Sequence, residues 1–358
     1  MNTDGCCMGG NIINTYDAET EQSLTNNIRV INKDLNQLFP YLKKNGSDFM
    51  AYSTLQDGLE YFIIENIGYI AFKKFTHALL APRGLNFVVA DPITDKKDFK
   101  YIISLFIKHQ GPSIFLMITA EVSLILKELG YHINQFGGAP EIDVQDFSLK
   151  GKEKEHIRRW YNKAVKEGVT VVEDKIENVD MERLKFVSDQ WLAHKGGKEY
   201  KLMNRPFVYS SEPDIRYFFA YHNNNLVAVT GFDPIYENNK IIGYFKNIVR
   251  FSDDAPHGTI VLATYTAIEK FKGEDIQRLC MGISPFSNIS NDDMNDCRTM
   301  YYLSSFLYKY CTFIYPFQGN EFHKKRYGGT KKQFYYSTLP DHNKLLQLLS
   351  ALKVLNCF

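Results

Sequence analysis

The sequence predicts an α+β protein built of two stacked units. Three observations support this prediction. The 358 residues are 44 % hydrophobic and 23 % charged, which is typical of a globular chain with a real core. The 23 tyrosines and 26 phenylalanines favour sheet, because aromatic rings fit a pleated, half-buried surface. Strands, a helix after a strand and a closing strand follow in roughly the same order in each half.

The first half reads as short strands around two helices. Apolar residues at helical spacing predict a helix over Asp98–His109, and a second over Glu121–Leu129 stops at Gly130, a usual C-cap residue. Strand-like pieces at His132–Phe136 and Glu141–Val144 close this unit. Further strands are expected at Phe49–Ser53, Leu59–Ile64, Tyr69–Phe72, Asn86–Ala90 and Ser113–Ile118.

The second half begins at the charged run Lys150–Arg159, which opens an amphipathic helix to about Glu167. Expected helices follow at Met181–His194, Thr259–Lys272, Arg298–Cys311 and Asn343–Val354, and expected strands at Val169–Val172, Asn225–Gly231, Ile241–Arg250 and Arg278–Ile283. These elements divide the chain into a loose tail (1–25), an N-terminal unit (26–150), a C-terminal unit with the active cleft (151–340) and a C-terminal packing helix (341–358).

Charge and cysteine usage exclude several classes of protein. Lys and Arg number 42 against 41 Asp and Glu, so contact with nucleic acid or acidic lipid needs a local patch. The six cysteines form no C-x-x-C pair, so we expect reduced thiols and no metal site. The N-terminus lacks an apolar signal segment, and no window approaches the roughly 18 apolar residues of a membrane span. We therefore expect a cytoplasmic protein without integral membrane association, whose oligomeric state the sequence leaves open.

A loop before the helix at Thr259 is the first candidate site. A strand that feeds a helix through a glycine-bearing loop presents backbone N–H groups and the positive helix end to an anion. The sequence there is Asp253-Asp254-Ala255-Pro256-His257-Gly258. Two carboxylates would repel a diphosphate, and Pro256 removes one N–H donor. An ordinary strand-to-helix loop explains the same residues equally well.

Three further stretches carry charge at suggestive spacing. The stretch 322–332 interleaves five cations with aromatic residues and glycines, which suits phosphates and unpaired bases, although a solvated surface loop is the simpler reading. Lys195 and Glu199 flank a glycine-flexed loop, with Arg205 further on, and such groups hold carboxylates or transfer protons. Asp293 belongs to an acidic loop that could cup an ammonium group or simply be solvated.

Six motifs follow one another between Asn86 and Tyr336. They are Phe87-Val-Val-Ala-Asp91-Pro92, Leu129-Gly130-Tyr131 with Gly137-Gly138-Ala139, Trp191-Leu192 with Glu199, Arg250 with Asp254-Ala255-Pro256-His257-Gly258, Gly282-Ile-Ser284-Pro285, and Phe317-Gln-Gly319 with Lys324, Arg326 and Tyr327. In this order the motifs resemble the C-terminal domain of the phosphatidylglycerol lysyltransferases. The resemblance implies two fused GNAT-like units and an aminoacyl-tRNA donor in place of coenzyme A, so that no cofactor is expected.

The resemblance and the residue patterns together assign roles. Glu199 and Lys195 are the catalytic candidates, with Glu199 assisting proton transfer or orienting the substrate. The substrate-binding candidates are Arg205, Arg250, Asp254, Gly258, Gly282, Ser284 and Asp293. The candidates for holding the tRNA acceptor end are Lys324, Arg326, Lys331 and Lys332.

Departures from the family pattern shape the expected reaction. The membrane half of those enzymes is missing from this sequence, so we expect a small amine, hydroxylamine or hydroxyl acceptor rather than a lipid headgroup. Val261 stands where the resemblance implies an acidic residue, which favours an uncharged amino acid over lysine. An acetyl-CoA-dependent N-acetyltransferase and a noncatalytic binding module remain alternatives.

Overall fold

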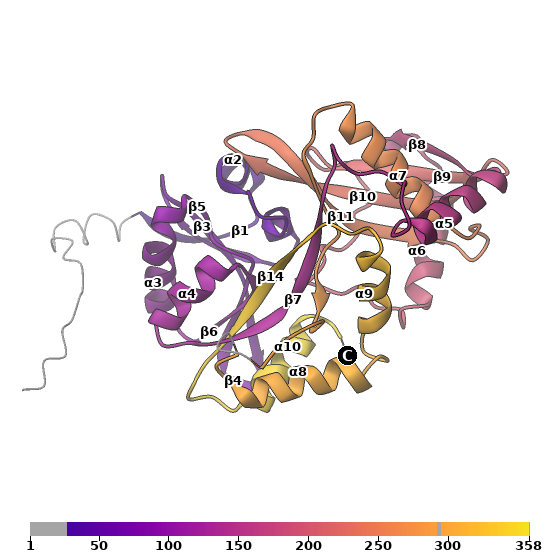
Figure 1. Ribbon diagram of the computed structural model, residues 1–358. Coiled ribbons are helices and arrows are strands. Elements are labelled where there is room, and N and C mark those ends of the chain that lie inside the picture. The colour runs from indigo at the N-terminus through magenta and orange to yellow at the C-terminus, as the bar shows by residue number, and fades with distance from the viewer. Residues whose placement is uncertain (1–26, 292–294, 358) are drawn as a thin grey trace, which may run out of the picture.

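The computed structural model describes residues 27–291 and 295–357; the expected tail 1–25 therefore lies outside the described residues. Within them, fourteen strands form one continuous sheet that runs through both halves of the molecule (Figure 1). Its order is β1-β2-β3-β4-β6-β14-β7-β12-β11-β10-β9-β8, with β5 beside β3 and β13 beside β7. The central position of β7 and β14 makes them the junction of the two halves.

In the first half, the helices Phe99–Gln110 and Ala120–Glu128 cover one face of the sheet (Figure 1). Its strands are β1 (Ile28–Asn32), β2 (Glu60–Ile64), β3 (Gly68–His77), β4 (Ala81–Val89), β5 (Ile93–Thr94), β6 (Ser113–Ile118) and β7 (His132–Asp143). Its helices are α2 (Leu35–Asn45), α3 (Phe99–Gln110) and α4 (Ala120–Glu128), with short 3₁₀ turns at Ala51–Leu55 and Lys96–Asp98. Because α3 buries Phe99, Ile102, Ile103 and Phe106 on one stripe, it packs against the sheet.

The second half repeats this plan with more helices. Its strands are β8 (Thr170–Asp174), β9 (Arg216–His222), β10 (Asn225–Glu237), β11 (Lys240–Phe251), β12 (Arg278–Cys280), β13 (Ser284–Pro285) and β14 (Thr330–Thr338). Its helices are α5 (Glu155–Lys166), α6 (Met181–Ala193), α7 (Thr259–Lys272), α8 (Arg298–Tyr310), α9 (Phe317–Lys325) and α10 (Lys344–Val354), with a 3₁₀ turn at Ile176–Asn178. The expected hairpin is present, since β10 and β11 pair antiparallel along their length.

One strand of the second half is inserted between two strands of the first half. β14 comes from the segment that the sequence assigns to the C-terminal unit, yet it lies between β6 and β7 of the first half. The parallel pair of β11 and β12 then continues the sheet from the other edge of β7. One core cluster accordingly contains Phe49 together with Phe245 and Phe334. The boundaries at 150 and 340 stay a prediction, but hydrogen bonds of the sheet cross the boundary at 150.

Two local expectations are wrong. Phe49–Ser53 is no strand; a 3₁₀ turn begins at Ala51, and Ser53 N–H donates to the Met50 carbonyl. The run is buried on every side, so its apolar character carries no strand periodicity. His132–Phe136 and Glu141–Val144 are joined in one strand, β7, in which Gly137 leaves room for the neighbouring strand β13. A Cβ there would lie 2.2 Å from the Ser284 carbonyl oxygen.

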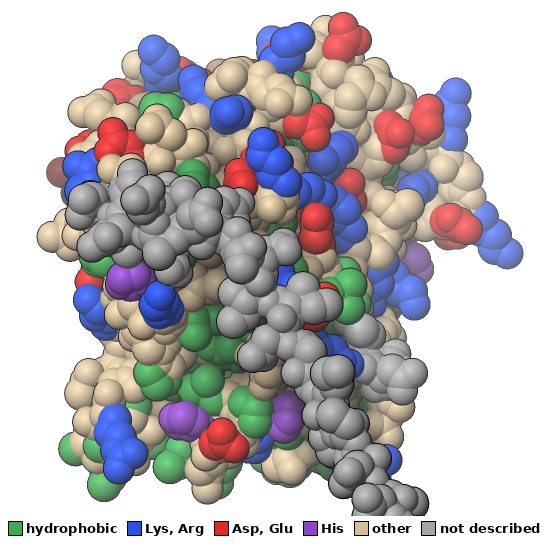
Figure 2. Space-filling view, turned by 90° about the vertical axis from the view of Figure 1, so that its left-hand side faces the viewer, with side chains coloured by type: hydrophobic (Ala, Val, Ile, Leu, Met, Phe, Trp, Pro, Cys, Tyr) green, Lys and Arg blue, Asp and Glu red, His purple; other side chains and the backbone are tan. Residues whose placement is uncertain are grey.

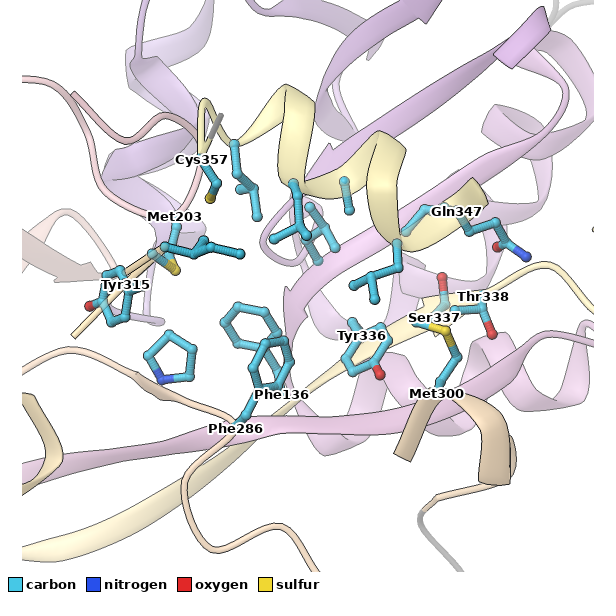
Figure 3. Close-up of a pocket in the computed structure, with 18 of the residues that line it drawn as sticks. Phe136, Met203, Phe286, Met300, Tyr315, Tyr336, Ser337, Thr338, Gln347 and Cys357 are labelled. Carbon is cyan, nitrogen blue, oxygen red and sulfur yellow. The ribbon is translucent and has the colours of Figure 1, made fainter. Parts of the chain in front are cut away.

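An apolar cavity lies beneath α10, between that helix, α8, α9 and the central strands (Figure 3). Phe136 and Tyr336 line it from the sheet, Met300 from α8 and Leu348 from α10. Its volume is about 50 Å³, which is the size of a packing gap rather than of a substrate site. Among the described helices, none has the length and apolar character that crossing a bilayer requires.

Candidate active site

Six of the sequence-predicted residues meet in one cavity of the second half. The cavity has a volume of about 290 Å³ and is lined by β11, the end of α6, the loop after α6 and α9. The six residues are Lys195, Glu199, Arg205, Arg250, Gly282 and Lys324. They lie far apart in the chain, and the packing of helices on the sheet brings them together.

Trp191, in the last turn of α6, forms an aromatic wall of this cavity. The Arg250 guanidinium lies 4.0 Å from the centre of the indole ring, and the Lys195 ammonium lies 5.6 Å from it. Arg250 Nη2 also donates to Glu199 Oε1 at 2.6 Å. Burial lowers the pKa of Lys195, and the nearby Arg250 charge lowers it further. This wall therefore presents two cations and one carboxylate that is already paired.

Two lysines enter the cavity from the interior of the fold. Lys246 lies in β11 and is 7 % exposed, and its ammonium donates to Thr264 Oγ1 at 3.2 Å. Lys324 on α9 donates to the Ile283 carbonyl at 2.8 Å. Burial lowers the pKa of Lys246 to about 7, with help from the Lys324 charge, and burial lowers that of Lys324 to about 8. Within the described chain, no carboxylate pairs with either ammonium.

The two lysines are the strongest chemical signal of the cavity. A buried ammonium without a charged partner is costly, and a protein interior ordinarily pairs or neutralises it. An anion bound in the cavity would supply the missing partner. The cavity is therefore suited to an anionic ligand, or to a reaction that develops negative charge.

His323 stands between this cavity and a second one at the start of α7. It lines both, together with Phe251 and Ile260. The second cavity has a volume of about 250 Å³ and is mainly apolar, with Gly258 and Val261 among its lining residues. Burial and three neighbouring cations lower the pKa of His323 to about 3, so its ring is neutral near pH 7. Neutral His323 thus adds no charge to either cavity.

The loop before α7 corrects one expectation. Asp254 forms an ion pair with Arg183 at 2.8 Å, and Asp253 lies 2.6 Å from His194 Nε2. Both partners belong to α6 or its end, so the two carboxylates are drawn to that helix. Asp254 therefore has a cation of its own, which weakens its expected repulsion of a diphosphate, whereas the Asp253 carboxylate contacts a histidine ring. Asp254 also lies outside the lysine-lined cavity.

The backbone of the same loop still offers a poor phosphate cradle. The N–H groups of Ala255 and Thr259 are already donated to carbonyls within the loop. Gly258, with φ 97°, lies so close to α5 that a Cβ would come within 2.1 Å of the Trp160 carbonyl oxygen. Glycine is thus required here by close packing on α5, which accounts for the residue without a ligand.

Arg205 lines the cavity, but its charge is neutralised inside the protein. The guanidinium donates to Asp233 at 2.9 Å and also contacts Glu212, and the residue is only 2 % exposed. Burial alone would lower the pKa of Arg205, but the two carboxylates raise it overall. A substrate-binding role for Arg205 stays a prediction, and the ion pairs give it a structural role as well.

The basic stretch 322–332 does not form one patch, because α9 ends within it and β14 begins. Arg326 lies over Trp160 and Phe322, 4.5 Å and 3.8 Å from the ring centres. Lys331 and Lys332 alternate along β14 and line different cavities. Only Lys324 of the four tRNA candidates lines the lysine-lined cavity.

Two other candidates lie elsewhere. Ser284 pairs with Gly138 of β7 and lines a separate cleft of about 130 Å³ together with Lys331. Asp293 lies outside the described residues. Sequence reasoning gave no role to Lys246, although a lysine in the middle of the run Tyr244-Phe245-Lys246-Asn247-Ile248 is a signal, since a charged residue is rarely buried without a function. Trp191, named from the sequence only as part of a motif, is part of the cavity wall.

Comparison with known proteins gives the fold a family. The family described as "Phosphatidylglycerol lysyltransferase, C-terminal" matches residues 40–337. The phosphatidylglycerol lysyltransferase of Bacillus subtilis (strain 168) is 24 % identical over 304 residues, which cover 82 % of this chain and 34 % of that protein. One from Staphylococcus epidermidis is 22 % identical over 303 residues, with the same coverage. The chain thus spans about a third of the length of these relatives.

Solved structures agree with this assignment. L-PGS from Bacillus licheniformis superposes with a TM-score of 0.72 at 19 % identity, covering 90 % of this chain and 98 % of that one. FemX superposes with a TM-score of 0.54 at 9 % identity, covering 90 % of this chain and all of that one. These likenesses confirm the expected α+β fold class. The chain belongs to the family of phosphatidylglycerol lysyltransferase C-terminal domains.

Proposed function

We propose that the lysine-lined cavity transfers an amino acid from aminoacyl-tRNA to an amine, hydroxylamine or hydroxyl acceptor. The observation that carries this proposal is the pair of buried lysines, Lys246 and Lys324, which lack a carboxylate partner in the described chain. The family name, which is that of a transferase acting with lysyl groups, supports the same class of reaction. The use of aminoacyl-tRNA and the chemical class of the acceptor are both parts of this proposal.

The reaction is an ordinary acyl transfer. The acceptor nitrogen or oxygen attacks the ester carbonyl carbon, a new C–N or C–O bond forms, and the ester bond to the ribose breaks. The nucleophile loses one proton, and the leaving ribose oxygen gains one. Negative charge develops on the carbonyl oxygen in between, and preorganised cations stabilise that charge most effectively where water is excluded.

The two lysines are suited to the two tasks of this reaction, which are to take a proton from the nucleophile and to stabilise the oxyanion. With a pKa of about 7, Lys246 holds a neutral amine in part of the molecules near pH 7, and such an amine can take the proton of the nucleophile. With a pKa of about 8, Lys324 remains mostly protonated and can stabilise the oxyanion. Glu199, held by Arg250, is suited to orienting the acceptor amine.

An acetyl-CoA-dependent N-acetyltransferase is less well supported. That reaction needs a diphosphate site, and the loop before α7 has two of its N–H groups donated internally. Pro256 provides none. We expect no specific binding of acetyl-CoA there; a micromolar one-to-one complex measured by calorimetry would contradict this.

The test is a deacylation panel. The protein is incubated with individually charged tRNAs, with and without small amine and hydroxylamine acceptors, and the loss of the ester is followed. Faster deacylation of at least one charged tRNA, with transfer to an acceptor, supports the proposal. A noncatalytic binding module would bind without accelerating any deacylation, and that result would refute the proposal.

A further inference from the structure

The outer face of α8 carries aromatic side chains where a surface helix ordinarily carries charge. Tyr302, Phe306 and Tyr310 are 62 %, 56 % and 59 % exposed, and Phe313, just past the helix, is 84 % exposed. The spacing of four residues places the first three on one side of the helix. We call these four residues the α8 aromatic surface.

These side chains are not required to complete the core. The opposite side of α8 buries Met300, Ser304 and Leu307, and Met300 reaches the apolar cavity that α10 covers (Figure 3). On the outer side, the centres of the Phe306 and Tyr310 rings lie 5.2 Å apart. An exposed apolar patch of this kind marks an interaction surface.

The helix that carries the α8 aromatic surface is itself basic. No Asp or Glu occurs between Cys297 and Asn320, a segment that includes all of α8, and the next acid, Glu321, accepts a hydrogen bond from the Tyr308 hydroxyl of α8. Arg298 and Lys309 are exposed on α8, and the Lys309 ammonium lies 5.1 Å from the centre of the Tyr310 ring. α8 runs along the lower edge of the molecule (Figure 1), and on the neighbouring face hydrophobic side chains are most visible in the lower half (Figure 2).

We propose that the α8 aromatic surface docks on an anionic lipid bilayer. Tyrosine rings prefer the headgroup level of a membrane, where their apolar body is buried and their hydroxyl stays wet, and phenylalanine rings insert into the apolar layer beside it. Lysine and arginine beside them are attracted by anionic headgroups, and α8 itself holds no acid. The positive charge and the aromatic side chains of α8 therefore both favour an anionic bilayer as the partner of this surface.

A second copy of the chain fits this surface less well. In a two-fold symmetric contact the same surface meets itself, which would bring Arg298 and Lys309 of both copies together. Like charges at an interface disfavour association. The inference does not depend on the proposed transfer reaction, but a docked chain would meet acceptors that are presented at a membrane surface.

The test is flotation of the full chain with vesicles of phosphatidylcholine, with and without phosphatidylglycerol. We expect binding to the anionic vesicles, weakened by salt, and a loss of about tenfold in Phe306→Glu, because a charge replaces an apolar anchor. Leu124→Glu on α4 is the matched control, since Leu124 is also an exposed helical residue, at 54 %. We expect the control to bind like the unchanged chain.

A second readout guards against a folding defect. Phe306→Trp should shift its fluorescence to shorter wavelength when anionic vesicles are added, and circular dichroism should show the helices unchanged. Absence of vesicle binding, or equal loss in Phe306→Glu and Leu124→Glu, would overturn the proposal. Dimerisation that Phe306→Glu abolishes, without vesicle binding, would assign the surface to a second copy instead.

Discussion

The two halves of the molecule hold cavities of opposite charge. The cavity of the first half, about 400 Å³, is lined by three carboxylates and two lysines: Asp48, Asp91, Glu121, Lys96 and Lys332. The cavity of the second half is lined by five cations and one carboxylate, Glu199. Burial raises the pKa of Asp91 from 3.8 to about 7, and the Asp48 charge adds to the rise. Burial lowers the pKa of Lys246 from 10.5 to about 7. Burial thus moves both groups toward neutrality from opposite directions.

The opposite charges are kept apart rather than paired. The Phe49 ring lies 4.9 Å from Phe245, which lines the basic cavity, and 5.0 Å from Phe334, which lines the acidic one. A direct ion pair between these carboxylates and lysines would have neutralised both charges, but the lysines would then not be free to bind a ligand. Asp91 finds local partners instead, accepting from Thr119 N at 2.9 Å and from Thr119 Oγ1 at 2.7 Å. The lysines keep fewer partners, which is why we place the chemistry in the second half.

The sharpest way to break this comparison is to remove the charge of Lys246. We expect Lys246→Met to lose about 10²–10⁴ of the deacylation rate, the usual contribution of one group that takes a proton in the reaction. The same change should leave the folded state equally or more stable, because methionine fills the space without a buried charge. Rate and thermal unfolding, measured on the same sample, separate the two effects.

The control for this variant is Lys325→Met. Lys325 is next to Lys324 on α9 but is exposed and does not line the basic cavity. Its rate should stay within about twofold of the unchanged chain, as is usual for a surface substitution. Equal activity in Lys246→Met and Lys325→Met would remove the lysine pair from the mechanism.

The charge of the basic cavity also predicts which amino acid it accepts. Its one carboxylate in the described lining, Glu199, is already paired with Arg250, so the ammonium of a lysyl group would meet only cations. We expect alanyl-, seryl- or glycyl-tRNA to be deacylated about tenfold faster than lysyl-tRNA, a difference of about 1.4 kcal/mol. Val261, which suggested the same preference, borders the neighbouring apolar cavity rather than this one.

Asp293 is the natural objection to that prediction, because it lies outside the described residues and could supply a carboxylate. The panel of charged tRNAs should therefore be repeated with Asp293→Asn. Robust turnover of lysyl-tRNA that this variant abolishes would overturn the preference for an uncharged donor. An unchanged panel would leave the basic cavity as the determinant.

The third test compares the two cavities by pH. Asp91 binds its proton more tightly when folded, so stability falls as pH rises from about 4 to 7. Lys246 binds its proton less tightly when folded, so stability rises as pH rises from about 7 to 10.5. Asp91→Asn should flatten the first change and Lys246→Met the second, each by at least about 1 kcal/mol, roughly the value of one pKa unit.

Chemical denaturation across this pH range measures both changes. Lys325→Met again serves as the control, and its curve should run parallel to that of the unchanged chain. If the Asp91→Asn and Lys246→Met curves were also parallel to it, burial would not be moving these two groups toward neutrality. That result would refute the statement that burial shifts the pKa of Asp91 and the pKa of Lys246 in opposite directions.

The fold was largely predictable because most of its helices and strands have a clear apolar pattern within their own short segment of sequence. The strand Ser113–Ile118 and the helix Met181–His194 have clear apolar patterns, and the structure has them at nearly these bounds. β14 was not predicted, since its first residues are the cations Lys331 and Lys332 and only its second half is buried. Its place between β6 and β7 depends on pairing across some 200 residues, which no local pattern records.

The candidate site was predictable only in part. Glu199 and Arg250 were found by type and motif, and the structure brings them within 2.6 Å. The division of the basic stretch between α9 and β14 could not be read from its composition, because charge runs look alike whether buried or solvated. The pairing of Asp254 with Arg183 likewise depends on how α6 packs beside the loop. Three-dimensional partners, rather than residue types, decide which charges are free.

The smallest expected effect concerns the cations around the two cavities. Arg326 lies on the aromatic rings of Trp160 and Phe322, beside the basic half, whereas Lys332 lines the acidic cavity and lies 3.6 Å from Glu141. If tRNA binds at the basic half, Arg326→Ala should change the slope of log K against log salt by about 0.7–0.9, the share of one phosphate contact. Lys332→Ala should leave the slope unchanged, because its ammonium faces a carboxylate of the protein. Affinities of both variants for one uncharged tRNA, measured over a range of salt concentrations, give the two slopes. A larger change in Lys332→Ala than in Arg326→Ala would place the nucleic acid on the acidic half and reverse the comparison.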